Sequence, residues 1–138
     1  MKVTSQLILD IKESETAIEH LLEKGDYNQA KKLLDTLNSK TENFYLLTTN
    51  YWCSLGEYEA AFETLEDGIK MFRFSYKLYQ RLAQLSYDVG DIANAAYFYT
   101  KLVKLSDSPE TQERNSATLN VLIGELEALE EQIGRAHV

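Results

Sequence analysis

Three short stretches of this sequence repeat one pattern and decide the fold: Gly25-Asp26-Tyr27-Asn28-Gln29-Ala30, Gly56-Glu57-Tyr58-Glu59-Ala60-Ala61 and Gly90-Asp91-Ile92-Ala93-Asn94-Ala95. Each stretch has a glycine, an acidic residue, a large apolar residue, two variable residues and an alanine. The glycines lie 31 and then 34 residues apart, and half of the six glycines in the chain occupy this slot. A period of this length is typical of helical repeat proteins.

The residues around each stretch predict two helices joined by a tight turn. Apolar residues recur at helical spacing before each glycine and then stop, as Leu46 and Trp52 do before Gly56. Glycine accepts the left-handed conformation that ends a helix, and the acid after it can cap the next helix. The alanine is small, so we expect the two helices to approach closely there. The expected structural positions of the repeat are Gly25, Ala30, Gly56, Ala61, Gly90 and Ala95.

The pattern resembles the tetratricopeptide repeat (TPR), a helix-turn-helix unit of 34 residues, over roughly residues 12–107. Tyr45 and Tyr79 stand at the early aromatic slot of that family. The sequence departs from the family in its Leu-Gly pair, which is Ala17-Ile18, Thr48-Thr49 and Leu82-Ala83 here. Its closing proline is replaced by Glu42, Arg73 and Asp107. A related helical-hairpin repeat of another family therefore remains open.

The expected fold is all-α. The resemblance implies a short right-handed α-α superhelix within residues 1–107, with helix hairpins at about 4–39, 42–71 and 75–105. Single helices are expected at about 4–24, 27–39, 42–55, 57–71, 75–89, 91–105 and 109–133. Ser108-Pro109-Glu110 is a strong helix start, so residues 108–133 are expected to form a C-terminal capping helix, followed by a tail at 134–138.

The last helix carries a narrow apolar stripe at alternating spacings of three and four residues: Leu119, Leu122, Leu126, Leu129 and Ile133. One interpretation is a cap over the open end of the last repeat. The other is a docking helix or the seam of a homodimer, because a coiled coil uses the same spacing.

Charge and composition exclude several classes of partner. The 138 residues carry a formal net charge of −8, which disfavours nucleic acid and anionic membranes. No apolar run approaches the ~20 residues of a membrane span, and the first residues lack the apolar stretch of a signal peptide. Cys53 is the single cysteine, so no disulfide can form within the chain. We expect a cytoplasmic protein.

The charge is unevenly distributed along the chain. Residues 106–138 hold seven acids and two basic residues, whereas the stretch Gly68–Tyr87 holds no acid. That stretch interleaves cations with aromatic residues: Lys70, Phe72, Arg73, Phe74, Tyr76, Lys77, Tyr79, Arg81 and Tyr87. It either binds an acidic peptide or a phosphate group, or it has its aromatics in the core and its cations in water.

The resemblance implies a concave, peptide-binding groove lined by the first helix of each hairpin. By that resemblance the groove residues are Leu46, Asn50, Cys53, Lys77, Gln80, Arg81, Gln84 and Tyr87, together with Asp88. Lys77 and Arg81 match two basic positions with which some family members hold a terminal carboxylate. Glu15 and Glu19 stand where the other clamp residues would be, so at most half of such a clamp is expected.

No catalytic motif is evident. The histidines are His20 and His137. His20 has Glu23 three residues on, which could contact a metal, but no second His or Cys is near. No Gly-rich phosphate loop and no Gly-x-Ser-x-Gly motif are present. We therefore expect no enzyme, no metal and no cofactor.

The expected function is that of a protein-interaction module that binds a peptide or helix in its concave groove. Two alternatives remain open. One is a small acidic TPR chaperone of the secretion type, which holds one specific substrate. The other is an interaction or regulatory domain excised from a larger protein, which includes the case of an enzyme.

Overall fold

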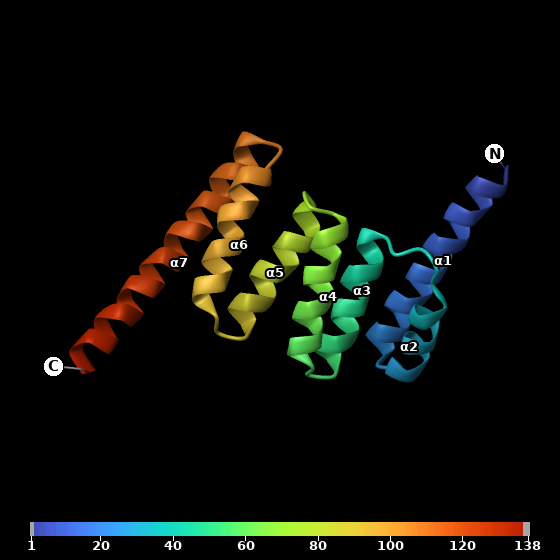
Figure 1. The fold of residues 1–138 in the computed structure, drawn as a ribbon, viewed down its shortest axis with the longest axis horizontal. Helices are drawn as coiled ribbons and strands as arrows, with labels where there is room; N and C mark the ends of the chain where they lie inside the picture. Colours follow the sequence, from blue (N-terminus) through green and yellow to red (C-terminus); the bar gives the residue numbers. More distant parts are fainter. Residues whose placement is uncertain (1, 137–138) are drawn as a thin grey trace. The chain divides into compact units, whose positions relative to one another are not determined.

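The computed structural model describes residues 2–136, and it describes side chains from residue 6 onward. Over this range the chain forms helices joined by turns and short loops, with no strand (Figure 1). The helices are α1 (Lys2–Lys24), α2 (Tyr27–Thr36), α3 (Glu42–Ser54), α4 (Tyr58–Met71), α5 (Tyr76–Asp88), α6 (Ile92–Leu105) and α7 (Pro109–Ala136). The expected all-α fold is therefore confirmed.

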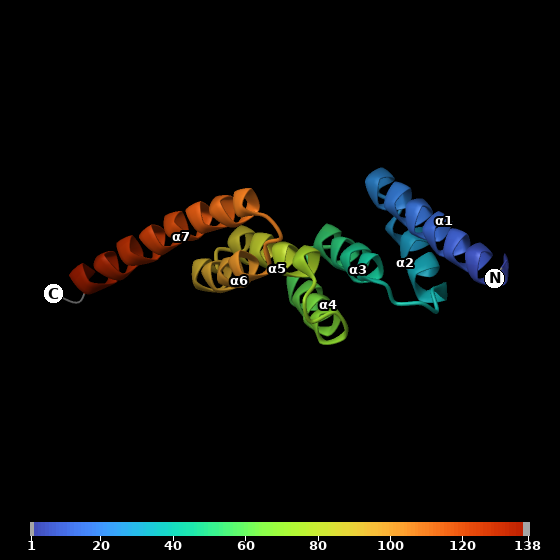
Figure 2. The same ribbon diagram turned by 90° about the horizontal axis from the view of Figure 1, so that it is seen from above.

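The chain divides into two compact units, Met1–Arg73 and Phe74–Val138. In the first unit α1 packs against α2, α3 packs against α4, and α3 also contacts both α1 and α2. In the second unit α6 packs against α5 on one side and against α7 on the other (Figures 1 and 2). Each unit is therefore a stack of neighbouring antiparallel helices.

The three repeat glycines make the turns of the hairpins. Gly25, Gly56 and Gly90 have φ of +81°, +74° and +84°, which is the left-handed conformation. The N–H of the next residue donates to a carbonyl five residues back in every case: Asp26 to Leu21 (2.9 Å), Glu57 to Trp52 (2.9 Å) and Asp91 to Ser86 (2.8 Å). This bond satisfies a carbonyl at the end of the preceding helix, so one local device closes all three hairpins.

The acids after the glycines differ in what they do. The Oδ1 atoms of Asp26 and Asp91 accept hydrogen bonds from the N–H groups of Gln29 and Asn94, at 3.3 and 3.1 Å. Both aspartates therefore cap the second helix of their hairpin. Glu57 makes no such bond, because its side chain is one methylene longer than that of the preferred capping residue.

Small residues lie at the centre of each hairpin. Ala30, Ala61 and Ala95 all have an exposed fraction of 0%. Ala30 belongs to a core cluster with Ile18, Leu34 and Leu47 in the first unit. In the second unit Ala95 packs with Ala96 and Leu122, and half-buried Ile92, Tyr99, Leu119 and Leu126 surround them.

Two helix ends differ from the expected ones. α2 ends at Thr36 rather than near residue 39, because Leu37 takes an extended backbone with ψ of 120°. α7 continues to Ala136, so the tail expected from residue 134 begins as helix. Gly134 lowers helix stability by about 1 kcal/mol relative to Ala, which does not stop a helix of this length. His137 and Val138 of that tail lie outside the described residues.

Candidate functional site

A pocket of about 420 Å³ lies where α5, α6 and α7 meet in the second unit. Its lining residues are Gln84, Tyr87 and Asp88 from α5, Tyr99 from α6, and Thr118, Val121, Leu122 and Glu125 from α7. Tyr87 and Val121 are 48% and 61% exposed, although both are large apolar residues. We call this hollow the apolar pocket, since tyrosine rings and aliphatic side chains form much of its lining.

A second pocket of about 360 Å³ lies at the other end of α5. It is lined by Tyr76, Lys77 and Gln80 from α5, by Leu105 at the end of α6, by Asp107 in the following loop, and by Thr111 and Arg114 from α7. Arg114 donates to the Thr111 hydroxyl at 3.5 Å. Two cations and one acid leave an excess of positive charge, so we call this hollow the basic pocket.

A buried asparagine fixes the helices that form both pockets. Asn115 of α7 is only 6% exposed. Its Nδ2 donates to the Tyr76 hydroxyl of α5 at 2.8 Å and to the Ser106 hydroxyl at 3.1 Å. The Ser106 hydroxyl in turn donates to the Leu102 carbonyl of α6 at 2.6 Å. This chain of hydrogen bonds ties α5, α6 and α7 together beside the basic pocket, which Tyr76 lines.

Tyr99, which lines the apolar pocket, has a shifted pKa. Burial raises the pKa of its phenol above the usual 10.0, and the negative charge that Tyr76 acquires on deprotonation raises it further. The group therefore stays protonated at neutral pH, and it can donate a hydrogen bond as well as accept one.

The structure distributes the expected groove residues of the second unit between the two pockets. Gln84, Tyr87 and Asp88 line the apolar pocket, and Lys77 and Gln80 line the basic pocket. Arg81 lines neither of these two pockets and is half-buried. The cation that lines the basic pocket together with Lys77 is therefore Arg114 of α7, and not Arg81.

The other expected groove residues lie on α3 in the first unit. Asn50 is exposed, whereas Leu46 and Cys53 are half-buried. Their part in binding stays a prediction. Glu15, which occupies a clamp position in the family pattern, is 7% exposed and accepts a 2.6 Å hydrogen bond from the Thr41 hydroxyl. Since Thr41 caps α3 by accepting from the Phe44 N–H, Glu15 contributes to the packing of α1 against the start of α3.

The contributions of α6 and α7 to the pockets were missed in the sequence. The signal for α7 was present, because the 34-residue period continues past the third hairpin. Four groove positions of α5 reappear in α7 one period later: Lys77 as Thr111, Gln80 as Arg114, Gln84 as Thr118 and Tyr87 as Val121. All four α7 residues line the pockets. α7 therefore packs against α6 and also lines both pockets.

The basic and aromatic stretch Gly68–Tyr87 is divided between the two units. The boundary between the units falls after Arg73, within the stretch. Phe74 is 82% exposed and Tyr87 48% exposed, whereas Phe72, Tyr76 and Tyr79 are half-buried. Its aromatics therefore divide between partial burial and exposure, and neither interpretation holds for the whole stretch.

Among the residues that the structure describes, no group of three or more His, Cys, Asp or Glu side chains is placed to hold a metal ion. None of the described helices combines the length and the apolar character that crossing a bilayer requires.

Comparison with known proteins places the fold. No family model matches the sequence, and no curated protein matches it. The type III secretion translocator chaperone SycD of Yersinia enterocolitica is similar in structure, with a TM-score of 0.67 at 18% identity, over 85% of this chain and 86% of that one. PcrH of Pseudomonas aeruginosa is similar with a TM-score of 0.67 at 18% identity, over 83% of this chain and 92% of that one. Its complex with the chaperone binding region of PopD matches at the same TM-score and identity, over 84% and 92% of the two chains. The chain therefore has the TPR-like all-α fold of these chaperones.

Proposed function

We propose that this protein is a cytoplasmic TPR chaperone that holds an extended segment of one exported protein in the groove of its second unit, and that it is not an enzyme. The observation that carries the proposal is the apolar pocket between α5 and α7. The fold supports it, because PcrH has been solved with the chaperone binding region of PopD, and SycD with a peptide of the translocator YopD.

The two pockets define the ligand that fits. Lys77 and Tyr87 lie ten residues apart on α5, so the pockets are separated by about 15 Å along the helix axis. An extended peptide advances about 3.3 Å per residue and covers that distance in about five residues. The ligand therefore carries an apolar side chain for the apolar pocket and an acidic group about five residues away for the basic pocket.

Polar side chains between and beside the pockets fix the ligand further. Gln80 and Gln84 are both exposed on α5, and each offers a donor and an acceptor to an extended backbone. Asp88 and Glu125 border the apolar pocket and repel an acid placed there. The ligand thus binds in one direction, with its acidic group toward Lys77 and Arg114.

The test uses overlapping peptides from the proteins encoded beside this gene, labelled with a fluorophore and titrated by anisotropy. Tyr87→Ser removes an exposed wall of the apolar pocket, and we expect it to weaken binding by more than about tenfold. Tyr97→Ser is the matched control, because Tyr97 is 54% exposed on α6 and does not line the pocket. Equal affinities of the two variants for every bound peptide would disprove the proposed groove.

A further inference from the structure

The repeat pattern reaches a fourth copy inside α7. Gly124 follows Gly90 by 34 residues, and an acid, Glu125, comes after it. Large apolar residues then stand two, five and nine residues after the glycine, as Leu126, Leu129 and Ile133. The second helix of the third hairpin has Ile92, Ala95 and Tyr99 at the same offsets. Residues 125–136 therefore carry the pattern of a second hairpin helix.

The turn of this fourth hairpin does not form. Gly124 is not among the described glycines with positive φ, and α7 continues through it to Ala136 (Figure 1). The closed hairpins have a wholly buried alanine five residues after the glycine, whereas this copy has Leu129. The larger side chain holds two helices apart at the point where the repeat brings them closest.

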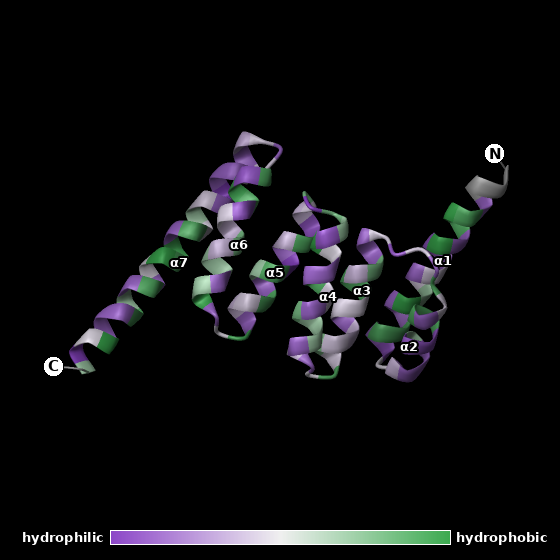
Figure 3. Ribbon diagram, viewed as in Figure 1, coloured by the Kyte–Doolittle hydropathy of each residue, from purple (hydrophilic) through white to green (hydrophobic). Residues whose placement is uncertain are grey.

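Within residues 2–136 no helix folds back on the end of α7, and part of its apolar face is uncovered there. Leu122 is 3% exposed beneath α6, but Leu129 and Ile133 are 45% and 59% exposed. After a hydrophilic start, hydrophobic residues alternate with hydrophilic ones along the rest of α7 (Figure 3). We call Leu126, Leu129 and Ile133 the distal stripe. They lie on one face of the helix, since their spacing alternates between three and four residues.

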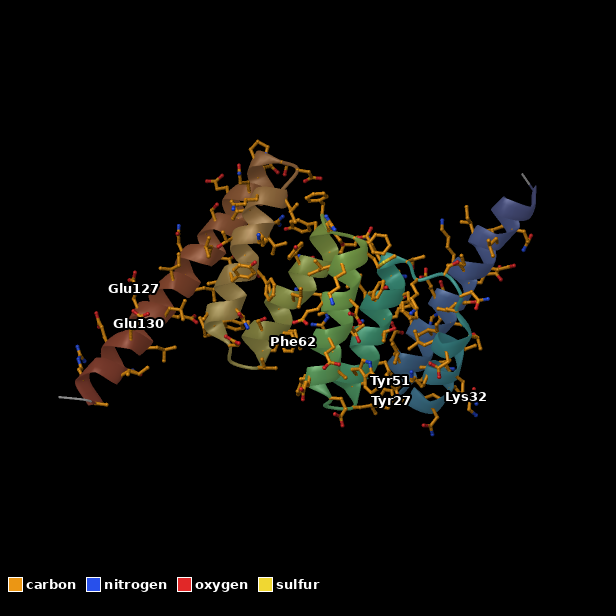
Figure 4. All side chains as sticks on the ribbon, in the orientation of Figure 1. Tyr27, Lys32, Tyr51, Phe62, Glu127 and Glu130 are labelled. Atoms are coloured by element: carbon orange, nitrogen blue, oxygen red, sulfur yellow. The ribbon has the colours of Figure 1, made fainter. Side chains whose placement is uncertain are left out.

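The charges beside the distal stripe decide what can cover it. With Leu126 and Ile133 at a positions and Leu129 at d, Glu125 is at g and Glu130 at e. Glu130 is exposed, as is the neighbouring Glu127 (Figure 4). A parallel second copy would place Glu125 opposite Glu130, and an antiparallel one would place like positions opposite each other. In both arrangements a carboxylate faces a carboxylate, and the repulsion between them disfavours the homodimer seam.

We propose that the distal stripe binds a basic amphipathic helix of another protein. Lys or Arg beside the apolar positions of that helix pairs with Glu125 and Glu130 in either direction, while its apolar face covers Leu129 and Ile133. The same acids repel an anionic membrane. The surface shares Glu125 with the border of the apolar pocket, but none of the three residues of the distal stripe lines that pocket. The inference does not rest on the proposed function.

The experiment uses the full chain and a synthetic helical probe of about three heptads, with Leu at a and d and Lys at e and g. The same peptide with Glu at e and g is the control probe. Fluorescence anisotropy gives the affinities. We expect the Lys probe to bind more than about tenfold tighter than the Glu probe. Leu129→Ser with Ile133→Ser should weaken the Lys probe by more than about tenfold, since both residues are exposed and removing them leaves the core intact.

A matched pair of charge variants distinguishes binding at the distal stripe from non-specific electrostatic attraction between the probe and the chain. Glu130→Lys lies beside the stripe, whereas Glu131→Lys lies at f on the opposite face and makes the same change of charge. We expect the first to weaken the Lys probe several-fold more than the second. The proposal fails if these two variants behave alike, if the serine variant binds the probe like the wild type, or if no binding is seen. It also fails if sedimentation shows a dimer that the serine variant dissociates.

Discussion

Replacing glycine by alanine at two equivalent positions of the repeat should have opposite effects. Gly90 has φ of +84°, and an added Cβ would meet nothing within 4 Å. The cost of Gly90→Ala is therefore confined to the backbone, at about 1–2 kcal/mol for an alanine in the left-handed region. The unfolded chain loses entropy on the same change, which offsets about 0.4–1 kcal/mol. We expect a net loss of about 1 kcal/mol in the free energy of unfolding.

Gly124 lies one period later, and there the same change should stabilise. Its Cβ would also meet nothing within 4 Å, but its backbone is helical. Alanine is favoured over glycine inside a helix by about 0.8–1 kcal/mol. The two variants should therefore differ by about 2 kcal/mol, although each adds a single methyl group to open space.

Urea unfolding of the full chain, followed by far-UV circular dichroism, measures the difference. Both glycines belong to the second unit, so both variants report on the same part of the chain. For a slope of about 2 kcal/mol per molar urea, the midpoints should lie about 1 M apart with unchanged slopes. A Gly124→Ala variant that is as unstable as Gly90→Ala would show that Gly124 forms a left-handed turn in solution. The uncovered distal stripe would then not exist.

The remaining predictions concern packing, a buried hydrogen bond and a phenol. Ala95→Leu should lower the free energy of unfolding by about 1–3 kcal/mol, because Ala95 is 0% exposed and the larger side chain has no room. Ala93 is exposed, so the control Ala93→Leu should change that free energy by less than about 0.5 kcal/mol in the same urea assay. Asn115→Ala removes the donor to Tyr76 and Ser106 and should lower the free energy of unfolding by about 1–3 kcal/mol. Asn120 is exposed, so Asn120→Ala is the control. Equal urea midpoints of the two variants would show that the hydrogen-bond network does not contribute to stability. The raised pKa of Tyr99 makes its deprotonation harder in the folded state than in the unfolded state. Its contribution to stability is therefore full below about pH 10 and is lost above it, and Tyr99→Phe should flatten the stability profile in that range.

The fold was predictable because the hairpins are set by short-range chemistry. Glycine with positive φ, an aspartate that accepts from the N–H three residues on, and a buried alanine all fall within six consecutive residues of the chain. A periodic sequence shows such a device directly. The end of α2 was missed because Asn38 and Ser39, which follow Leu37, signal a stop more weakly than glycine or proline does. The extended backbone of Leu37 leads into the Thr41 cap of α3.

The candidate site was predictable only in part, because its residues meet through packing between helices. Gln84 and Tyr87, which the repeat register assigns to the groove, line the apolar pocket, and their part in binding stays a prediction. The register could not show that Arg81 is half-buried, since that depends on how α5 packs against its neighbours. The buried Asn115 gave no pattern in the sequence, because a single polar residue in a helix is usually exposed.

The unfinished fourth copy shows what a turn in this chain requires. Gly124 and Glu125 supply the same kinds of residue as Gly90 and Asp91 at the third hairpin, yet α7 continues through them as one helix. Glycine therefore permits the turn without causing it, since a continuing helix keeps backbone hydrogen bonds that a turn interrupts. A hairpin forms only where burial of apolar surface at the crossing point outweighs that loss. Leu129 prevents the close approach that alanine allows, so the same residue both keeps α7 extended and leaves its apolar face open to another helix.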